Sequence, residues 1–283
     1  MKENITPCFW FDGQAKEAAA LYCSVFADAK ITSQSAIVTA INVSGYSITL
    51  LDGGPMYKPN PAISFFYICE KEEELNKIWN AFSKEGTVLM PLDKYPWSEK
   101  YGWVSDRFGI SWQIALGNIS DVGQKITPCL MFTGNQYGKA DEAIAHYSSI
   151  FKNVKVDGIL RYGANESPDQ EGKVKHAQLA LNDHKFMIME SAAQHNFSFT
   201  EGVSLTVYCE TQKEIDYYWE KLTESGKESM CGWLKDKFGV SWQIIPTVLG
   251  KIMSEPAKAG KAAQAFMAMR KLNIEQIVQA SIS

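Results

Sequence analysis

The chain has 283 residues, of which 46% are hydrophobic and 21% are charged, and its formal net charge is −4 at pH 7. This composition is ordinary for a soluble globular protein, and the length allows two domains of about 120 residues, each with its own core. Lysine and arginine are scattered without a basic stripe, so we expect no nucleic-acid partner. No apolar run approaches the ~18 residues of a membrane span, and the start of the chain has no apolar leader. We therefore expect a cytoplasmic protein without a membrane partner.

The strongest pattern in the chain is an internal repeat. The segment GWVSDRFGISWQI at residues 102–114 returns as GWLKDKFGVSWQI at residues 232–244, with nine of thirteen positions identical. In the same order, ITPCFWF at residues 5–11 returns as ITPCLMF at residues 126–132. The period of about 120 to 140 residues is the size of a small domain, which excludes a solenoid of short repeats.

The repeat predicts two homologous modules, residues 1–118 and residues 125–250. Between them the segment GNISDVGQ at residues 117–124 is polar and rich in turn-forming residues, as expected of a junction. Residues 251–283 form a C-terminal helical extension in this scheme. Apolar residues there follow broadly helical spacing with a break at Leu272–Asn273, which predicts two short helices.

Each module is predicted to open with a strand whose residues alternate between two faces. In the first half Phe9 and Phe11 share one face, while Thr6, Cys8 and Trp10 share the other. The second copy has the same alternation.

Helices and hairpins follow this strand. Alanines and aromatic residues between Ala15 and Phe26 recur at three- and four-residue steps, which predicts a helix. Alternating runs around Ser44–Gly45 predict a hairpin, and Asn182–Asp183 takes the place of this turn in the second half. The later elements of the first half are a strand at 62–69, a helix at 72–83 and a hairpin at 103–114. The order strand, helix, hairpin, strand, helix, hairpin indicates an α+β fold.

The last hairpin of each half turns at an aspartate, Asp106 or Asp236, followed three residues later by glycine. We interpret both aspartates as structural, because such a tight turn needs them. The six cysteines show no C-x-x-C spacing, and four of them lie in apolar strand-like runs, so we interpret them as buried free thiols.

Three segments carry a resemblance to a known family: FDGQAKEAAALYCSVF, LLDGGPMYKPNPAISFFYICE and CGWLKDKFGVSWQIIP. They resemble the PhnB-like proteins of the glyoxalase/bleomycin resistance, or vicinal-oxygen-chelate, superfamily, in its two-module form. Members often carry the label 3-demethylubiquinone-9 3-methyltransferase. The resemblance covers residues 5 to 250. It implies tandem βαβββ modules, as in dihydroxybiphenyl dioxygenase-like proteins, with curved mixed sheets that pair to form a cup for a small molecule.

The resemblance also implies where ligands of a divalent metal would lie, since metal-dependent members use the first and last strands of each module. Those positions fall on Thr6 or Cys8, Thr127 or Cys129, Gln113, and Gln243. Threonine and glutamine offer neutral oxygens, whereas a catalytic divalent ion needs imidazole and carboxylate ligands. We expect no cofactor and no tightly held metal, with a weakly bound divalent ion as the alternative. The residues expected to bind a small-molecule ligand are Thr6, Cys8, Trp10, Asp52, Trp103, Gln113, Thr127, Cys129, Trp233 and Gln243.

The catalytic candidates are Glu190, His195 and His176. His195 follows Glu190 by a short loop, and a carboxylate and an imidazole at the rim of a cup could form a general acid/base pair. The alternative is that these residues end a hairpin and make local hydrogen bonds. The first half has no histidine, so the halves cannot hold two equivalent acid/base sites. It carries instead the aromatic segment PLDKYPWSEK at residues 91–100, which either closes over an apolar ligand or covers a sheet edge.

Two classes of function follow. The first is a binding protein that holds a small molecule in its cup without a tightly held metal. The alternative is a superfamily enzyme with lyase- or isomerase-type chemistry on a small oxygenated substrate. Methyl transfer is not expected, because no G-x-G-x-x-G turn for an adenosyl cofactor occurs in the chain. A homodimer is expected, with the modules pairing either within one chain or across the dimer.

Overall fold

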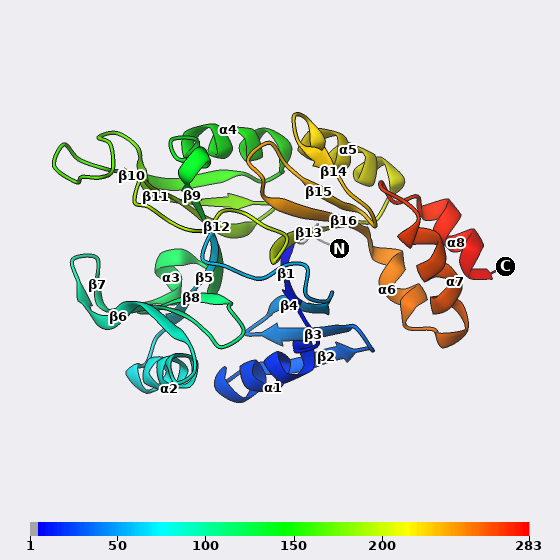
Figure 1. The fold of residues 1–283 in the computed structure, drawn as a ribbon, viewed down its shortest axis with the longest axis horizontal. Coiled ribbons are helices and arrows are strands. Elements are labelled where there is room, and N and C mark those ends of the chain that lie inside the picture. The colour runs from blue at the N-terminus through cyan, green and yellow to red at the C-terminus, as the bar shows by residue number, and fades with distance from the viewer. Residues whose placement is uncertain (1–4, 283) are drawn as a thin grey trace. The chain divides into compact units, whose positions relative to one another are not determined.

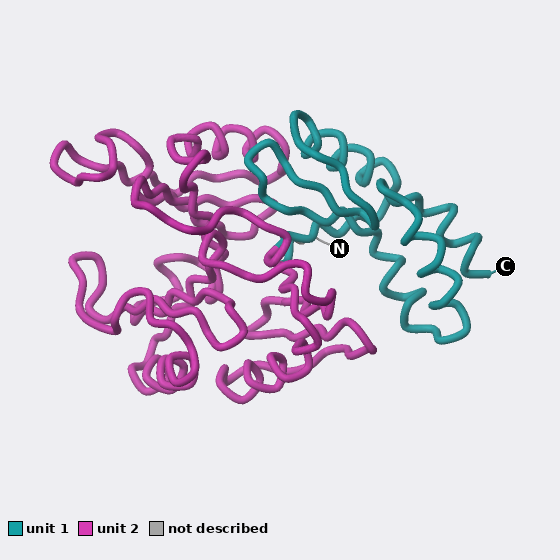
Figure 2. Tube along the Cα trace, in the orientation of Figure 1, with its two compact units in different colours: residues 1–6, 204–283 teal, residues 7–203 magenta. Residues whose placement is uncertain are grey.

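The computed structural model describes residues 5–282. They form two compact units (Figure 2): one comprises residues 7–203, and the other comprises residues 204–283 with the chain start up to Thr6. No helix in the described part of the chain is long and apolar enough to cross a membrane.

The unit of residues 7–203 holds most of the strands. Its strands are β1 (Ile5–Phe11, which begins before the unit boundary), β2 (Ala29–Gln34), β3 (Val38–Val43), β4 (Tyr46–Asp52), β5 (Ile63–Cys69), β6 (Thr87–Tyr95), β7 (Ser98–Ser105), β8 (Ser111–Leu116), β9 (Ile126–Thr133), β10 (Lys155–Arg161), β11 (Val174–Leu181) and β12 (His184–Ser191). Its helices are α1 (Ala15–Val25), α2 (Glu72–Ser83), α3 (Ile119–Val122), the 3-10 turn η1 (Gly134–Gln136) and α4 (Ala140–Ile150).

The other unit contains one strand group and the C-terminal helices. Its elements are β13 (Val203–Cys209), α5 (Gln212–Thr223), β14 (Lys227–Glu228), β15 (Trp233–Lys235), β16 (Ser241–Pro246), α6 (Thr247–Met253), α7 (Pro256–Met267) and α8 (Ile274–Ile282). The two helices expected in the C-terminal extension are α7 and α8. They pack with α6 around a small apolar core that includes Leu249, Ala262, Leu272 and Ile277.

The strands fall into four groups of the same βαβββ form, two in each half of the sequence. In each group the first strand is parallel to its neighbour, as β1 is to β4 and β5 is to β8, and the remaining strands run antiparallel. One helix covers each group: α1, α2, α4 and α5 lie against their own strands (Figure 1). The expected α+β fold of βαβββ modules is confirmed. The sequence patterns do not predict one outer strand in each group, namely β2, β6, β10 and β14.

The second group of the first half joins the first group of the second half in one sheet. Its strand order is β10-β11-β12-β9-β5-β8-β7-β6, and β5 pairs antiparallel with β9 at its centre. The last strand of the first half, β8, is therefore separated from the first strand of the second half, β9, only by β5. The compact units consequently do not coincide with the two sequence repeats.

The turn between β7 and β8 is fixed by a buried carboxylate. Asp106 Oδ1 accepts hydrogen bonds from the backbone N–H groups of Phe108 and Ile110, and Oδ2 accepts one from Trp112 Nε1 and one from the Tyr22 hydroxyl. Trp112 and Tyr22 belong to the aromatic core between the sheet and the helices, and both are fully buried. Asp236 makes the same turn bonds in the other unit. Both aspartates are thus structural.

Candidate functional site

The eight-stranded sheet presents one face to α2 and α4 and an opposite, inner face to a group of aromatic and sulfur-containing side chains. We call this group the inner-face cluster: Phe66, Met90, Tyr95, Tyr101, Trp103, Ala115, Met131, Met189 and Phe197. Its members come from β5 to β9, from β12 and from the segment after β12. Both halves of the sequence therefore build it.

Gln113 is the polar centre of the inner face. Its Nε2 donates a hydrogen bond to Ser64 Oγ at 2.8 Å, and its Oε1 accepts one from the Tyr101 hydroxyl at 2.8 Å. Beside it, Trp103 Nε1 donates to Ser111 Oγ at 2.7 Å. Burial raises the pKa of Tyr101, so its hydroxyl stays a neutral donor. The amide of Gln113 is therefore held in one orientation within an apolar wall.

Strand β9 brings Thr127 and Cys129 to the same sheet as Gln113. Cys129 pairs in register with Ser64, and Thr127 pairs with Phe66, whose other neighbour is Gln113. The Thr127 hydroxyl is buried and has no hydrogen-bond partner within residues 5–282. Burial raises the pKa of the Cys129 thiol to about 12, although hydrogen bonds from Gln113 and Ser64 act in the opposite direction. Gln113 and Thr127 are both predicted site residues, and they come from different halves of the sequence. They thus lie on the two sides of the same β5 residue, Phe66.

This donor set does not fit a divalent metal ion. Gln113 uses both amide atoms within the protein, the Cys129 thiol is protonated at neutral pH, and Thr127 adds only a hydroxyl. Divalent ions prefer carboxylate, imidazole or thiolate ligands, and binding requires the deprotonated form. Among the described residues, no group of three or more His, Cys, Asp and Glu side chains is arranged to hold a metal.

The matching positions of the other unit are similar but not identical. Gln243 Nε2 donates to Ser204 Oγ at 2.9 Å, and Trp233 on β15 pairs in register with Gln243. Cys231 stands at the place that a tyrosine occupies in the first half. The amide of Gln243 therefore has no phenol at the corresponding position. On β1, which crosses the unit boundary, Thr6 and Cys8 are both buried, and Cys8 belongs to the unit of residues 7–203.

Trp10 occupies on β1 the position that Met131 has on β9. Its Nε1 donates to the carbonyl of Gly54 at 2.7 Å, and its ring meets Tyr57 edge-on at 5.1 Å between centroids. A Cβ on Gly53 would lie 2.2 Å from the indole, so the ring fills the space against this loop. Met131 is smaller and flexible, which favours the inner-face cluster over the Trp10 position as a place for a ligand.

His176 lies on β11, one residue before Ala177, which pairs with Ile188. Gln178, two residues further along, pairs with Met187, which packs with Cys129. Because strand residues alternate between faces, His176 also belongs to the inner face. Burial lowers the pKa of its imidazole, so the ring is neutral at pH 7.

We expect acidification to destabilise the protein in part through His176. The pKa of this histidine is lowered in the folded state, while the unfolded state keeps the ordinary value near 6.5, so protonation favours unfolding. The contribution of the neutral ring is complete above about pH 6.5 and is lost as the pH falls through the lowered pKa. Urea unfolding at neutral and mildly acidic pH should show a smaller acid loss for His176→Gln than for the wild type. His184→Gln, at the start of β12, is the control, and an equal loss in all three proteins would refute the assignment.

Glu190 lies on the face of β12 opposite to the inner face, next to α4. One carboxylate oxygen accepts the backbone N–H of Val174 at 3.0 Å, and the other accepts the N–H of Gly138, just before α4. Burial raises the pKa of Glu190, and these two hydrogen bonds oppose the shift. Asp52 plays the same part in the first half, where it accepts the N–H of Ala15 at the start of α1. Both carboxylates are engaged in holding a helix start to a strand.

His195 is not brought together with Glu190 and lies instead beside Ser191. Its Nε2 is 3.0 Å from Ser191 Oγ, and its ring packs on Phe197 at 4.9 Å between centroids. Burial lowers the pKa of His195, and the charge of Asp169 opposes the shift. Ser191 shares the inner face with Met189 two residues earlier on β12. The sequence predicts that His195 pairs with Glu190, but in the structure His195 pairs with Ser191, at the edge of the inner face.

Ser64, Tyr101 and the methionines of the inner-face cluster are not among the site residues that the sequence predicts. One signal for Ser64 was available, because a serine stands at matching positions, Ser64 and Ser204, just as glutamine stands at Gln113 and Gln243. Tyr101 has no such signal, since its counterpart is a cysteine.

Comparisons with known proteins agree with this architecture. The sequence profile of a family described as 3-demethylubiquinone-9 3-methyltransferase matches the chain twice, at residues 3–115 and 124–245. A PhnB protein from Bacillus cereus is similar at 30% identity over 40% of this chain and 98% of that protein, with a TM-score of 0.38. A comparison with curated proteins found no match.

The comparison with solved structures also finds glyoxalase-type proteins. Glyoxalase I from Zea mays aligns over 90% of this chain and 97% of its own, with a TM-score of 0.56 and 11% identity. Lactoylglutathione lyase from Agrobacterium tumefaciens aligns over 39% of this chain and 90% of its own, with a TM-score of 0.30 and 14% identity. At 11% identity the likeness to the maize enzyme concerns the fold alone, and it extends over nearly the whole chain.

Proposed function

The chain belongs to the 3-demethylubiquinone-9 3-methyltransferase family of PhnB-like proteins, and from this premise we propose that it binds a small, uncharged, oxygenated molecule at the inner-face cluster without a tightly held metal. The observation that carries the proposal is the amide of Gln113, held by Ser64 and Tyr101 inside a wall of aromatic and methionine side chains. Methyl transfer is not proposed, because the chain has no Gly-rich turn for an adenosyl cofactor.

The charge of the ligand follows from the polar groups on the inner face. Gln113, Thr127 and Tyr101 are neutral, and burial keeps the imidazole of His176 neutral as well. An ion placed there loses its hydration without gaining a partner of opposite charge, which costs more than burying an unpaired neutral polar group and amounts to several kcal/mol even after the surroundings relax. The hydroxyl of Thr127, buried and without a partner among the described residues, can bond to a ligand oxygen.

Matched probes test the binding site. Saturation-transfer NMR with benzyl alcohol, acetophenone and benzoate should show binding of the two neutral compounds and weaker binding of the anion. Gln113→Leu should reduce binding of the neutral probes, because it removes the amide and leaves Tyr101 and Ser64 without their partner. The control is Gln243→Leu in the other unit. Preferential binding of benzoate, or equal effects of both variants, would contradict the proposal.

The absence of a tightly held metal is a separate prediction. Protein purified without chelator should contain less than one equivalent of any transition metal, because neutral amide and hydroxyl groups bind such ions weakly. Addition of zinc, nickel or magnesium salts should leave the melting temperature unchanged, since a metal that binds only the folded state would raise it. A stoichiometric metal whose stabilising effect disappears in Gln113→Leu would favour the enzyme alternative.

The contact between Ser191 and His195 favours an enzyme as the second candidate function. A neutral imidazole 3.0 Å from a hydroxyl at the edge of the ligand site can accept a proton from that hydroxyl or from a bound substrate. In such an enzyme, of lyase or isomerase type, His195→Gln should lower kcat by about 10²–10⁴ with little change in KM. His184→Gln is the matched control, and unaltered turnover in His195→Gln would exclude this role.

We also propose a homodimer, because the fold is built from paired modules that can combine within or between chains. Size-exclusion chromatography with light scattering decides this point, and a monomer over a wide range of concentrations would exclude it.

A further inference from the structure

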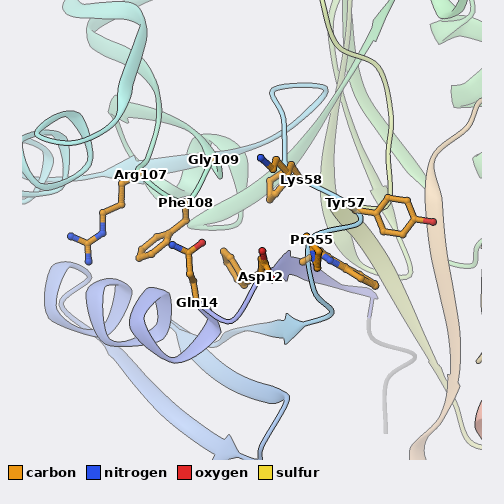
Figure 3. Close-up of a pocket in the computed structure, with 11 residues that line it drawn as sticks. Asp12, Gln14, Pro55, Tyr57, Lys58, Arg107, Phe108 and Gly109 are labelled. Atoms are coloured by element: carbon orange, nitrogen blue, oxygen red, sulfur yellow. The ribbon is translucent and has the colours of Figure 1, made fainter.

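A cavity of about 300 Å³ lies at the start of α1 and shares no residue with the inner-face cluster. Its walls come from the end of β1 with the residues leading into α1, from the loop after β4, and from the turn between β7 and β8 (Figure 3). Its polar side chains include Asp12, Gln14, Lys58 and Arg107, and its apolar wall includes Phe11 and Phe108. We call it the α1 pocket, and its size suits a small metabolite.

The walls of the α1 pocket are held in place by contacts within the protein. Trp10 is fixed at both ends, since its backbone N–H donates to the carbonyl of Gly202 at 3.0 Å and its indole N–H is bonded to the loop after β4. Phe108 packs edge-on against Phe11 at 6.0 Å between centroids. Gly202 lies so close to Lys58 that a Cβ would sit 2.1 Å from the Lys58 carbonyl oxygen. A pocket with such fixed walls gives up little entropy when it binds a ligand.

One of the two cations of the pocket is already neutralised. Arg107 Nη2 lies 2.6 Å from a carboxylate oxygen of Glu17, and Nη1 lies 2.9 Å from one of Glu85. The guanidinium also stands over the ring of Phe108 at 4.9 Å. Arg107 therefore closes the pocket wall and leaves Lys58 as the cation available to a ligand.

Three polar side chains of the pocket have no partner within the described residues: those of Lys58, Asp12 and Gln14. Figure 3 shows Asp12 and Gln14 next to the start of α1 and Lys58 on the other side of the pocket. Lys58 and Asp12 both line the pocket, carry opposite charges and are exposed, and no ion pair joins them within the described residues, so both charges are available to a ligand. Such a ligand needs an anionic group for Lys58 and a cationic group for Asp12, together with an apolar part for the aromatic and proline walls.

We propose that the α1 pocket binds a free α-amino acid with an aromatic or large apolar side chain. The ammonium group binds Asp12, the carboxylate binds Lys58 with help from the Gln14 amide, and the side chain packs among Phe108 and the neighbouring aromatic and proline residues. This site is independent of the ligand proposed for the inner-face cluster, which is uncharged.

Three probes that differ only in charge test the class of ligand. Isothermal titration or saturation-transfer NMR should show saturable binding of L-phenylalanine at millimolar concentration or below. Phenylpropionate lacks the ammonium group and phenethylamine lacks the carboxylate, so each should bind about threefold to fivefold more weakly, as expected for the loss of one partly exposed ion pair. No saturable binding of L-phenylalanine, or equal binding of all three, would overturn the proposal.

Variants locate the site. Lys58→Met and Asp12→Asn should each weaken binding of L-phenylalanine by about threefold to fivefold. Lys30→Met, at an exposed position on β2, and Asp28→Asn, at the exposed position just before β2, are the matched controls and should leave binding unchanged. Melting temperatures confirm that all four variants fold. If Lys58→Met and Asp12→Asn bind normally while Gln113→Leu does not, the amino acid binds at the inner-face cluster and the α1 pocket is wrongly assigned.

Discussion

Replacing Asp106 by alanine should lower the free energy of unfolding by about 3–5 kcal/mol. The carboxylate is 3% exposed. It accepts four hydrogen bonds, from the backbone of Phe108 at 2.9 Å and Ile110 at 3.1 Å, from Trp112 Nε1 at 2.9 Å and from the Tyr22 hydroxyl at 2.7 Å. Alanine leaves all four donors buried without an acceptor, and such groups cost far more than the loss of an exposed bond.

Urea unfolding followed by tryptophan fluorescence measures the effect. Asp121→Ala is the control, because Asp121 is exposed on α3 and its side chain accepts a single long hydrogen bond from residues 5–282, at 3.3 Å from Asn118 Nδ2. It should change stability by less than about 0.5 kcal/mol. Asp236→Ala repeats the experiment in the other unit, where Trp242 Nε1 donates at 2.8 Å. A loss below about 1 kcal/mol in Asp106→Ala would mean that the four donors find other acceptors.

These aspartates show why much of the fold could be predicted. A tight turn fixes its own residues locally, so the two Asp-first turns were recognised in the sequence and then found in the structure with the same hydrogen bonds. The hairpin around Ser44–Gly45 was equally local, and both turn residues have the positive φ that such a reversal requires. The repeat supported these predictions further, because the same pattern occurs in both halves of the sequence.

The outer strands could not be predicted because their sequences carry no burial pattern. β10 is exposed at all seven positions, and β2 is exposed at five of six. An edge strand pairs on one side only, and its polar residues do not alternate between a core and solvent. β6 is interrupted by three shifts of register against β7, which removes the period of two that identifies a strand.

Several residues of the candidate site could be predicted from the sequence, but the residues that lie next to them in the fold could not. The family resemblance points to Gln113 on the last strand of the first half and to Thr127 on the first strand of the second half, yet the pairing of β5 with β9 that joins them links distant parts of the sequence. Proximity along the chain predicts that Glu190 and His195 form a pair. Alternation along β12 puts Glu190 opposite to Met189, on the helix side of the sheet, and only the register with Phe132 makes this plain.

Met131→Trp should abolish binding of acetophenone and benzyl alcohol at the inner-face cluster. The substitution copies the first half of the chain, where Trp10 takes the corresponding place and fills the space beside Gly53 and Tyr57. An indole in place of the thioether takes up space within the inner-face cluster, beside Met189 and Trp103, which the proposed ligand would need. The added bulk should cost about 1–3 kcal/mol of stability, because an overpacked site forces its neighbours to shift.

Met131→Leu separates loss of space from loss of stability. Leucine keeps the volume of methionine, so this variant should bind both probes and lose less than about 1.5 kcal/mol of stability. Saturation-transfer NMR gives the binding, and urea unfolding gives the stability of each variant. If Met131→Trp folds and still binds the neutral probes as the wild type does, the ligand does not enter the space around Met131. If Met131→Leu also loses binding, the thioether itself contacts the ligand.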